Sequence, residues 1–137
     1  MGSGRQLLRA EQLELAPVRR TSFKIVVCRA APEGAEVLLR RVGQIWSLPT
    51  DACRLAELPE QGAGRYLREG WDLDLATVEL DCGERAEAMF AAEAEAADSG
   101  VFVPLRPGED WFGVGKVRAL VLGADGVLIE RVLGALE

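Results

Sequence analysis

The stretch that decides the fold is WSLPTDACRLAELPEQGAGRYLREGWDL, residues 46–73. Its second half predicts a helix that begins at Pro59, because proline is favoured in the first helical turn, and that runs to about Glu69. The first half predicts an irregular connection that leads into this helix. Residues at four-residue spacing mark the expected buried face of the helix, namely Ala63, Leu67 and Trp71.

Apolar runs lie before and after this stretch. Phe23 to Arg29 and Glu36 to Arg41 are dense in apolar residues, and turn-forming residues 31–34 separate them. The two runs predict a β-hairpin. Thr77 to Leu80 predicts a further strand after the helix.

The segment from Glu84 to Asp98 fits either of two elements. Its alanines and glutamates favour a helix by intrinsic propensity, but alternate residues also separate into an apolar and an acidic face, as in a strand. Periodicity alone does not decide between them. The apolar set is Ala88, Phe90, Ala92, Ala94 and Ala96, and the acidic set is Glu87, Glu93 and Glu95.

The last third of the chain contains three shorter patterns. Val101 to Leu105 predicts a short strand or an extended connection, and Val114 to Leu122 predicts either a short helix or a strand. The tail from Asp125 predicts a closing helix, because its apolar residues form one stripe. Strands with helices between and after them predict an α/β layered fold. The stripe consists of Leu128, Ile129, Val132, Leu133 and Leu136.

Length and charge limit the possible classes. A chain of 137 residues with 49% hydrophobic content suits one compact domain. We expect a single domain over residues 18–137, with residues 1–17 as an N-terminal leader and first segment. A net charge of -6 disfavours non-specific binding to nucleic acid or to anionic lipid.

Cysteine usage and hydropathy suggest the compartment. The three cysteines lie far apart, and the chain has no histidine to complete a zinc site. No signal-peptide pattern or membrane-length apolar run is visible in the sequence. We therefore expect a cytoplasmic protein without membrane contact.

Residues 51–73 resemble the Nudix box of the Nudix (MutT-like) hydrolase superfamily. The family pattern is G-x5-E-x7-R-E-U-x-E-E-x-G-U, where U is aliphatic, and an aromatic residue and Leu-Pro-Gly often precede it. Trp46 and Leu48-Pro49 stand at the expected distance before the box, which covers about a sixth of the chain. Five of the nine defined positions agree, namely Glu57, Arg65, Leu67, Glu69 and Leu73.

Four positions depart from the pattern, so the box is degenerate. Asp51 and Asp72 replace two glycines, and Tyr66 and Gly70 replace two glutamates. The resemblance implies a Nudix-like α/β/α sandwich with a mixed, partly antiparallel β-sheet. In that layout the segment 84–98 is a strand rather than a helix. A side chain at Asp51 also restricts the positive φ that glycine tolerates.

The resemblance implies an activity that depends on carboxylates. Nudix enzymes hydrolyse a diphosphate linked to another group with Mg²⁺ or Mn²⁺, and magnesium is held by several oxygen ligands. The box gathers its glutamates on one helix face through positions that correspond here to Tyr66, Glu69 and Gly70. Only Glu69 keeps a carboxylate, and a single exposed carboxylate holds a hydrated divalent ion weakly. We expect no bound cofactor unless the hydrolase alternative below holds.

The site residues follow from the same alignment. In an active enzyme Glu69 would be the catalytic and metal-binding residue, assisted by Arg65 and Glu57. Otherwise Glu57 and Arg65 brace the loop against the helix. Residues expected near a ligand are Tyr66, Trp46 and Asp51, and downstream carboxylates that would restore a metal site are Glu93, Glu95 and Glu109.

Three hypotheses remain open on the sequence. The leading one is a catalytically impaired Nudix-fold protein that acts by binding, as a protein-assembly module or a nucleotide sensor. The alternative is a divergent Mg-dependent hydrolase that cleaves a nucleoside diphosphate linked to another group, which requires at least three converging carboxylates. The third is an unrelated α/β protein. Trp111-Phe112 is a candidate surface for a protein partner, with core burial as the competing interpretation.

Overall fold

The computed structural model of the protein describes residues 20–71, 76–81, 87–99, 105–121 and 123–136. Its strands are β1 (Ser22–Arg29), β2 (Glu36–Val42), β3 (Ile45–Ser47), β4 (Thr50–Ala52), β5 (Thr77–Leu80), β6 (Ala88–Glu93) and β7 (Glu109–Gly113). Its helices are α2 (Pro59–Trp71), α3 (Val114–Leu120) and α4 (Gly123–Leu136).

All seven strands belong to one mixed sheet. The order along its main path is β3-β2-β1-β6-β5, while β4 pairs with β1 and β7 pairs with β2. β1 and β6 run parallel, from Phe23 opposite Ala88 to Cys28 opposite Glu93. The other strand pairs of the described sheet are antiparallel. The mixed sheet implied by the resemblance is therefore confirmed.

The central strand β1 is buried on both faces. Phe23, Ile25 and Val27 face one apolar cluster, whereas Val26 and Cys28 face the other. Their exposed fractions do not exceed 1%. Burial on both faces explains why this strand is a continuous apolar run instead of an alternating one.

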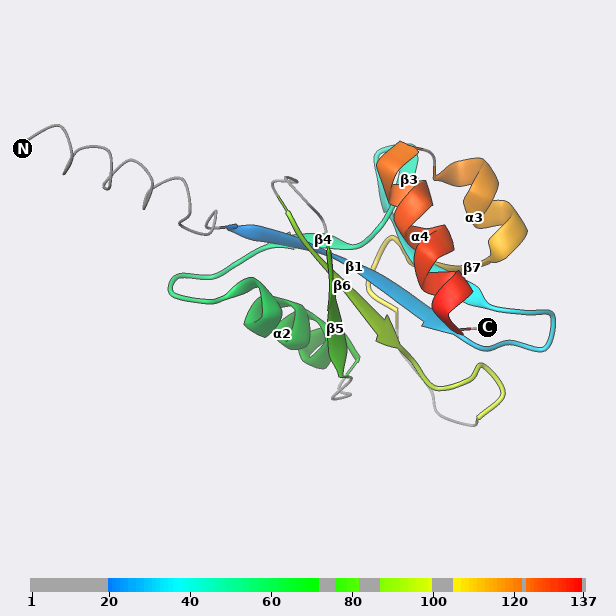
Figure 1. Ribbon diagram of the computed structural model, residues 1–137, viewed down its shortest axis with the longest axis horizontal. Helices are drawn as coiled ribbons and strands as arrows, with labels where there is room; N and C mark the ends of the chain where they lie inside the picture. The colour runs from blue at the N-terminus through cyan, green and yellow to red at the C-terminus, as the bar shows by residue number, and fades with distance from the viewer. Residues whose placement is uncertain (1–19, 72–75, 82–86, 100–104, 122, 137) are drawn as a thin grey trace, which may run out of the picture.

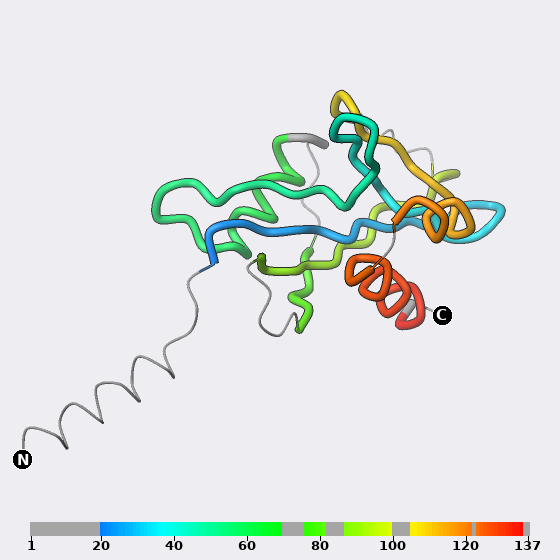
Figure 2. The backbone as a smooth tube through the Cα atoms, turned by 90° about the horizontal axis from the view of Figure 1, so that it is seen from above, coloured from blue at the N-terminus to red at the C-terminus, as the bar shows by residue number. Residues whose placement is uncertain are grey.

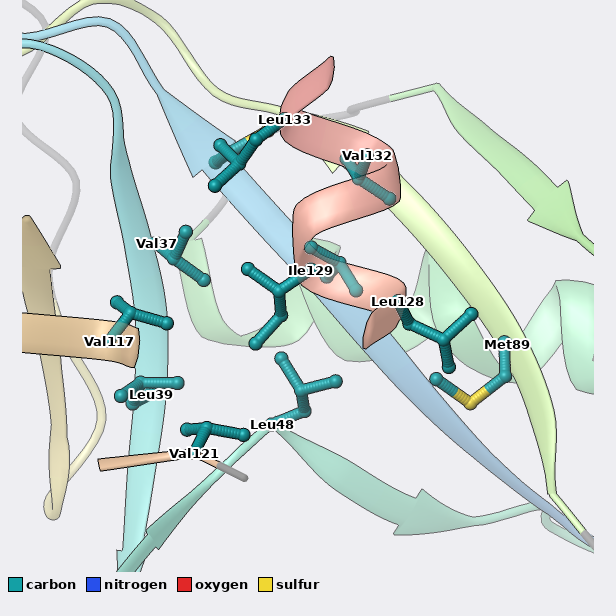
Figure 3. Packing of buried hydrophobic residues seen from close by; sticks show 12 residues of the cluster. Val37, Leu39, Leu48, Met89, Val117, Val121, Leu128, Ile129, Val132 and Leu133 are labelled. Carbon is teal, nitrogen blue, oxygen red and sulfur yellow. The ribbon is translucent and has the colours of Figure 1, made fainter. Parts of the chain in front are cut away.

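Helices cover both faces of the sheet, as Figures 1 and 2 show. α2 lies on one face and packs Ala63, Tyr66 and Leu67 against the Phe23 side of β1. α3 and α4 lie on the opposite face, where side chains of α4 point toward β1 and β2 (Figure 3). The buried side chains of α4 are those of the predicted stripe, namely Leu128, Ile129, Val132 and Leu133. The side chains of Trp71 and Leu136 lie outside the described residues.

Most of the predicted elements are present. The hairpin, the strand at Thr77–Leu80 and the closing helix are confirmed. Within 84–98 the strand interpretation is confirmed over Ala88–Glu93, and Val114–Leu120 is a helix rather than a strand. Residues 82–86 and 101–104 lie outside the described residues, as do residues 1–17.

One expectation about extended structure was wrong, and one strand was missed. The irregular connection after β2 contains two short strands, because β3 pairs with β2 and β4 pairs with β1. The strand β7 (Glu109–Gly113) was not predicted at all. These strands have three to five residues each, and such short segments show no periodicity. β4 and β7 pair with strands distant in sequence, whereas β3 forms a tight hairpin with β2.

Gly62 and Gly64 lie in the first half of α2, where glycine is unfavourable, but only Gly62 is explained by packing. A Cβ at Gly62 would lie 2.5 Å from Cε1 of Phe23 and 3.0 Å from Oε1 of Glu57. A Cβ at Gly64 would meet only Nη1 of Arg68, at an ordinary 3.5 Å. Gly62 therefore lets α2 approach β1 closely, whereas Gly64 has no steric requirement.

Alanine at these two positions is expected to have opposite effects. Gly62→Ala forces Phe23 to move and should lower the free energy of unfolding by about 1–3 kcal/mol, as overpacked sites do. Gly64→Ala should raise it by about 1 kcal/mol, because alanine is the better helix former. Urea denaturation of both variants measures the difference. Equal effects would show that Phe23 does not limit the helix position.

Candidate functional site

The loop before α2 is held in a defined turn. The amide of Glu57 donates to the carbonyl of Arg54 at 3.0 Å, and the amide of Arg54 donates to Oε1 of Glu57 at 3.0 Å. Ala56 within this turn has a φ of 63°, a left-handed conformation that costs a non-glycine residue energy. Asp51, by contrast, lies in the extended strand β4. The expected conflict with a positive φ therefore does not arise at Asp51.

The turn is tied to α2 by one two-point ion pair. Nε of Arg65 lies 2.8 Å from Oε2 of Glu57, and Nη2 of Arg65 lies 2.9 Å from Oε1. Arg65 also donates to the carbonyl of Ala52 at 3.2 Å. Both charged side chains are largely buried, with exposed fractions of 12% and 13%. The predicted brace between loop and helix is present.

This pairing changes the acidity of both groups. The hydrogen bonds from Arg65 and from the Arg54 amide lower the pKa of Glu57 from 4.5 to about 2. The hydrogen bond to Glu57 in turn raises the pKa of Arg65. Both side chains are thus charged across the range in which proteins function, and each satisfies the other.

The carboxylates of Asp51 and Glu69 also face guanidinium groups. Oε1 of Glu69 lies 3.0 Å from Nη2 of Arg54, and Oε2 of Glu69 lies 3.6 Å from Nη1 of Arg65. Oδ2 of Asp51 lies 3.9 Å from the same Arg65 nitrogen. The side chains of Glu69 and Asp51 are about half exposed, at 49% and 44%. Arg65 therefore contacts three carboxylates.

This arrangement does not fit the divalent ion that a Nudix box implies. The described residues contain no group of three or more His, Cys, Asp or Glu side chains placed to share a metal ion. Magnesium requires several oxygen ligands around one point, whereas these carboxylates are arranged around the guanidinium groups of Arg54 and Arg65. The Nudix box carries glutamates at three helix positions that correspond here to 66, 69 and 70. Of these, only position 69 keeps a carboxylate in this chain.

Tyr66, at the first of those positions, points into the protein. Its exposed fraction is 3%, and its ring meets Phe23 edge-on with centroids 6.3 Å apart. The phenolic hydroxyl donates to Oε2 of Glu109 at 2.6 Å. The guanidinium of Arg106 lies over the tyrosine ring, 3.6 Å from its centroid, and donates to the Tyr66 carbonyl. One face of the ring is therefore covered by an arginine.

Glu109 anchors this second cluster. Its side chain is fully buried, and it accepts a hydrogen bond from the Arg106 amide at 2.9 Å in addition to the Tyr66 hydroxyl. Burial and the contact with Glu109 raise the pKa of Tyr66 well above 10.0. Glu109 was a candidate for restoring a metal site, but its oxygens are committed to these donors. Arg106 was not singled out, since a lone arginine in a turn carries no motif.

The other predicted residues lie apart from this site. Trp46 packs edge-on against Phe112, 4.7 Å between centroids, on the sheet face covered by α3 and α4. Trp111 is half-buried on the opposite face, with the Arg29 guanidinium 4.3 Å above its ring. The Trp111-Phe112 pair is thus divided between the two faces of the sheet and does not form one surface.

The downstream glutamates are also separate from the box carboxylates. Glu93 ends β6 opposite Cys28 and lines an open cleft of about 870 Å³. The residues lining that cleft come from the β1–β2 turn, the start of α3 and the end of α4, and none belongs to α2 or its preceding loop. Glu95 is exposed just beyond β6. Neither belongs to a metal-binding group of the described residues.

Solved structures resemble this fold. The crystal structure of C. elegans Ap4A hydrolase matches 86% of this chain and 99% of its own at 16% identity, with a TM-score of 0.61. The NUDIX domain of Shewanella oneidensis NrtR, complexed with ADP ribose, matches 93% and 98% at 18% identity, with a TM-score of 0.53. The C-terminal domain of mouse MUTYH, in complex with human PCNA, matches 85% and 90% at 12% identity, with a TM-score of 0.55.

These likenesses define the class of fold. The chain has the Nudix α/β fold. The match extends over nearly the whole length of the C. elegans and Shewanella oneidensis domains. The sequence matches no protein-family model, and no curated protein matches it. Across the described part of the chain, no helix has the length and apolar character needed to cross a membrane.

The Glu57–Arg65 pair is expected to make stability depend on pH. Because the pKa of Glu57 is lowered to about 2, its contribution is complete above 4.5 and is lost as pH falls toward 2. The stability difference between wild type and Glu57→Gln should therefore shrink over that interval, as measured by urea denaturation at several pH values. In an Arg65→Met background the same substitution should show a smaller pH dependence, because of the two hydrogen-bonded groups only the Arg54 amide then remains.

Tyr66 can be followed directly, because it is the single tyrosine of the chain. Its raised pKa means that the folded protein resists ionisation, so this contribution to stability is present below pH 10 and is lost as pH rises further. Tyrosinate absorbance should appear at higher pH in folded protein than in concentrated urea. Glu109→Gln should move the folded curve toward the unfolded one; coincident curves for wild type would contradict the buried hydrogen bond.

Proposed function

We propose that this chain is a Nudix-fold binding module, impaired as a pyrophosphohydrolase, that acts as a nucleotide sensor or a protein-assembly module. One observation carries the proposal. Of helix positions 66, 69 and 70, only Glu69 supplies a carboxylate, and that carboxylate is paired with Arg54 and Arg65. Both oxygens of that carboxylate are engaged by guanidinium groups, which compete with a hydrated metal ion for them.

The burial of Tyr66 supports the same conclusion. A glutamate at this position would carry its charge into an apolar cluster that includes Phe23 and Leu67. The tyrosine instead fills that space and gives its hydroxyl to Glu109. The side chain stabilises the fold where the family uses it for chemistry. A protein that acts by binding needs the fold but does not need the metal ligands.

Two structural relatives support binding as the function. The Nudix domain of NrtR was crystallised with ADP ribose, and the MUTYH domain was crystallised with PCNA. For the sensor form we expect a nucleoside diphosphate derivative as ligand. Arg54 would contact its phosphates, because its side chain is 63% exposed and a guanidinium binds phosphate in a bidentate manner.

Thermal shift and turnover assays test the proposal together. Nucleoside triphosphates, ADP-ribose and dinucleotides should give no metal-stimulated release of phosphate or nucleoside monophosphate with Mg²⁺ or Mn²⁺. A sensor should nevertheless be stabilised by its ligand without metal, by about 2.7 kcal/mol at a hundredfold excess over Kd. Arg54→Ala should abolish that shift, whereas Arg131→Ala, which removes an exposed arginine of α4, should preserve it.

The alternative outcomes separate the hypotheses. Metal-dependent turnover that disappears in Glu69→Gln would overturn the binding module in favour of a divergent hydrolase. If no nucleotide shifts the unfolding temperature and no turnover occurs, the sensor form is excluded. The proposal then holds in its other form, a protein-assembly module. Turnover that survives Glu69→Gln would assign activity to a contaminant or to another site.

A further inference from the structure

The open cleft of about 870 Å³ lies at the end of the domain remote from the loop before α2 (Figures 1 and 2). The turn between β1 and β2, the start of α3 and the last turns of α4 come together there. Clefts of about 300–1,000 Å³ hold drug-sized ligands. The cleft shares no residue with the loop before α2 or with the cluster around Tyr66 and Glu109. What it binds is therefore a question separate from the candidate site.

Part of the cleft wall is apolar. Leu133 of α4 is buried, while Val114 at the start of α3 and Ala35 before β2 are half-buried. All three pack in or against the apolar cluster that lies beneath α3 and α4. This part of the wall offers a contact for an apolar side chain or for the apolar stem of a longer one.

Glycines leave the backbone bare where the two helices line the cleft. Gly115 lies in α3 and Gly134 lies in the last turns of α4, although glycine is unfavourable in a helix. Packing requires neither glycine, because a Cβ built on either one would meet no other part of the described chain within 4 Å. The bare backbone at both positions leaves room for a bound chain to approach the helices closely.

The charges on the cleft leave a negative excess. Each of its two arginines is held by a glutamate, and the pairs are Arg29–Glu36 and Arg118–Glu130. Glu33 and Glu93 line the same cleft, are exposed, and belong to none of the ion pairs found in the described part of the chain. The last turn of α4 has no basic residue, although the helix dipole is negative at that end. The cleft is therefore suited to a cationic group.

We propose that this cleft docks a basic peptide segment of a partner protein through a lysine or arginine side chain. Such a side chain combines an apolar stem with a charged end. It matches a cleft that offers Leu133 and Val114 together with the carboxylates of Glu33 and Glu93. Charge complementarity selects this occupant over a nucleotide or another anion. The inference goes beyond the proposed function, because it concerns a second site that is occupied whether or not a nucleotide binds beside Arg54.

Peptide pools test the proposal on the full chain. Immobilised pools of short peptides, random except for one fixed central residue, are probed with the labelled protein at physiological ionic strength, where distant surface charges are screened. Pools with a central arginine or lysine should retain the protein, and pools with a central aspartate or glutamate should not. Equal retention by all pools, or retention by none, would overturn the proposal.

Paired substitutions locate the contact. Glu33→Gln with Glu93→Gln should raise the Kd of a peptide recovered from the retained pools about tenfold, the effect of losing a charge-assisted hydrogen bond. Glu60→Gln with Glu79→Gln changes the net charge equally, at exposed positions outside the cleft, and should leave Kd unchanged. Fluorescence anisotropy measures both. Equal weakening by the two pairs would mean that the net charge of -6 attracts the peptide, and the cleft would be rejected as its site.

A side chain added inside the cleft tests its occupancy without removing a charge. Gly134→Leu should prevent peptide binding, because the leucine enters the open space beside α4. The helix should be retained, since leucine is a better helix former than glycine, and circular dichroism verifies this. Gly64→Leu, the matched change in α2, should leave Kd unchanged. Undiminished binding by the Gly134 variant would contradict the proposal.

Other occupants and other sites give distinct results. Self-association of the chain that Gly134→Leu abolishes would assign the cleft to a second copy and would overturn the peptide proposal. Arg54→Ala should leave peptide binding unchanged. Glu33→Gln with Glu93→Gln should in turn leave any nucleotide-induced thermal shift unchanged. Failure of this inference and failure of the nucleotide sensor are thus observed separately.

Discussion

The ion pair between Glu57 and Arg65 is the interaction on which the candidate site depends. It joins the loop after β4 to the middle of α2 through two hydrogen bonds. The same guanidinium also lies within 4 Å of the carboxylates of Asp51 and Glu69, at 3.9 and 3.6 Å, so three carboxylates, those of Asp51, Glu57 and Glu69, gather around it. A partly buried bidentate pair is directional. The geometry of the loop, including the left-handed Ala56, therefore follows from this contact.

The second constraint is the close approach of α2 to β1. Gly62 permits it, and Phe23 fills the contact from the strand side. Once the helix is this close, the residue one turn further, Tyr66, is carried into the core and meets Glu109 and Arg106. The packing thereby converts a position that bears a carboxylate in the family into one that ties α2 to the turn before β7.

The fold of this protein and its function are separate questions. The sheet and the two layers of helix make up the Nudix fold, as the structural likenesses show. A fold supports many functions, and a function has to be argued from its site. Here the site combines two guanidinium groups with three carboxylates, and the proposed binding function rests on that arrangement.

The sequence by itself determined the long elements and the brace. β1, β2, α2 and α4 have patterns long enough to read, and the resemblance to the Nudix box predicted the contact between Glu57 and Arg65. The tertiary structure alone decided the short strands β3, β4 and β7, the side-by-side placement of Tyr66, Arg106 and Glu109, and the separation of Trp46 from the site. The physical reason is range: periodicity and box spacing record neighbours within a few turns, whereas these features join residues that only the packed sheet brings together.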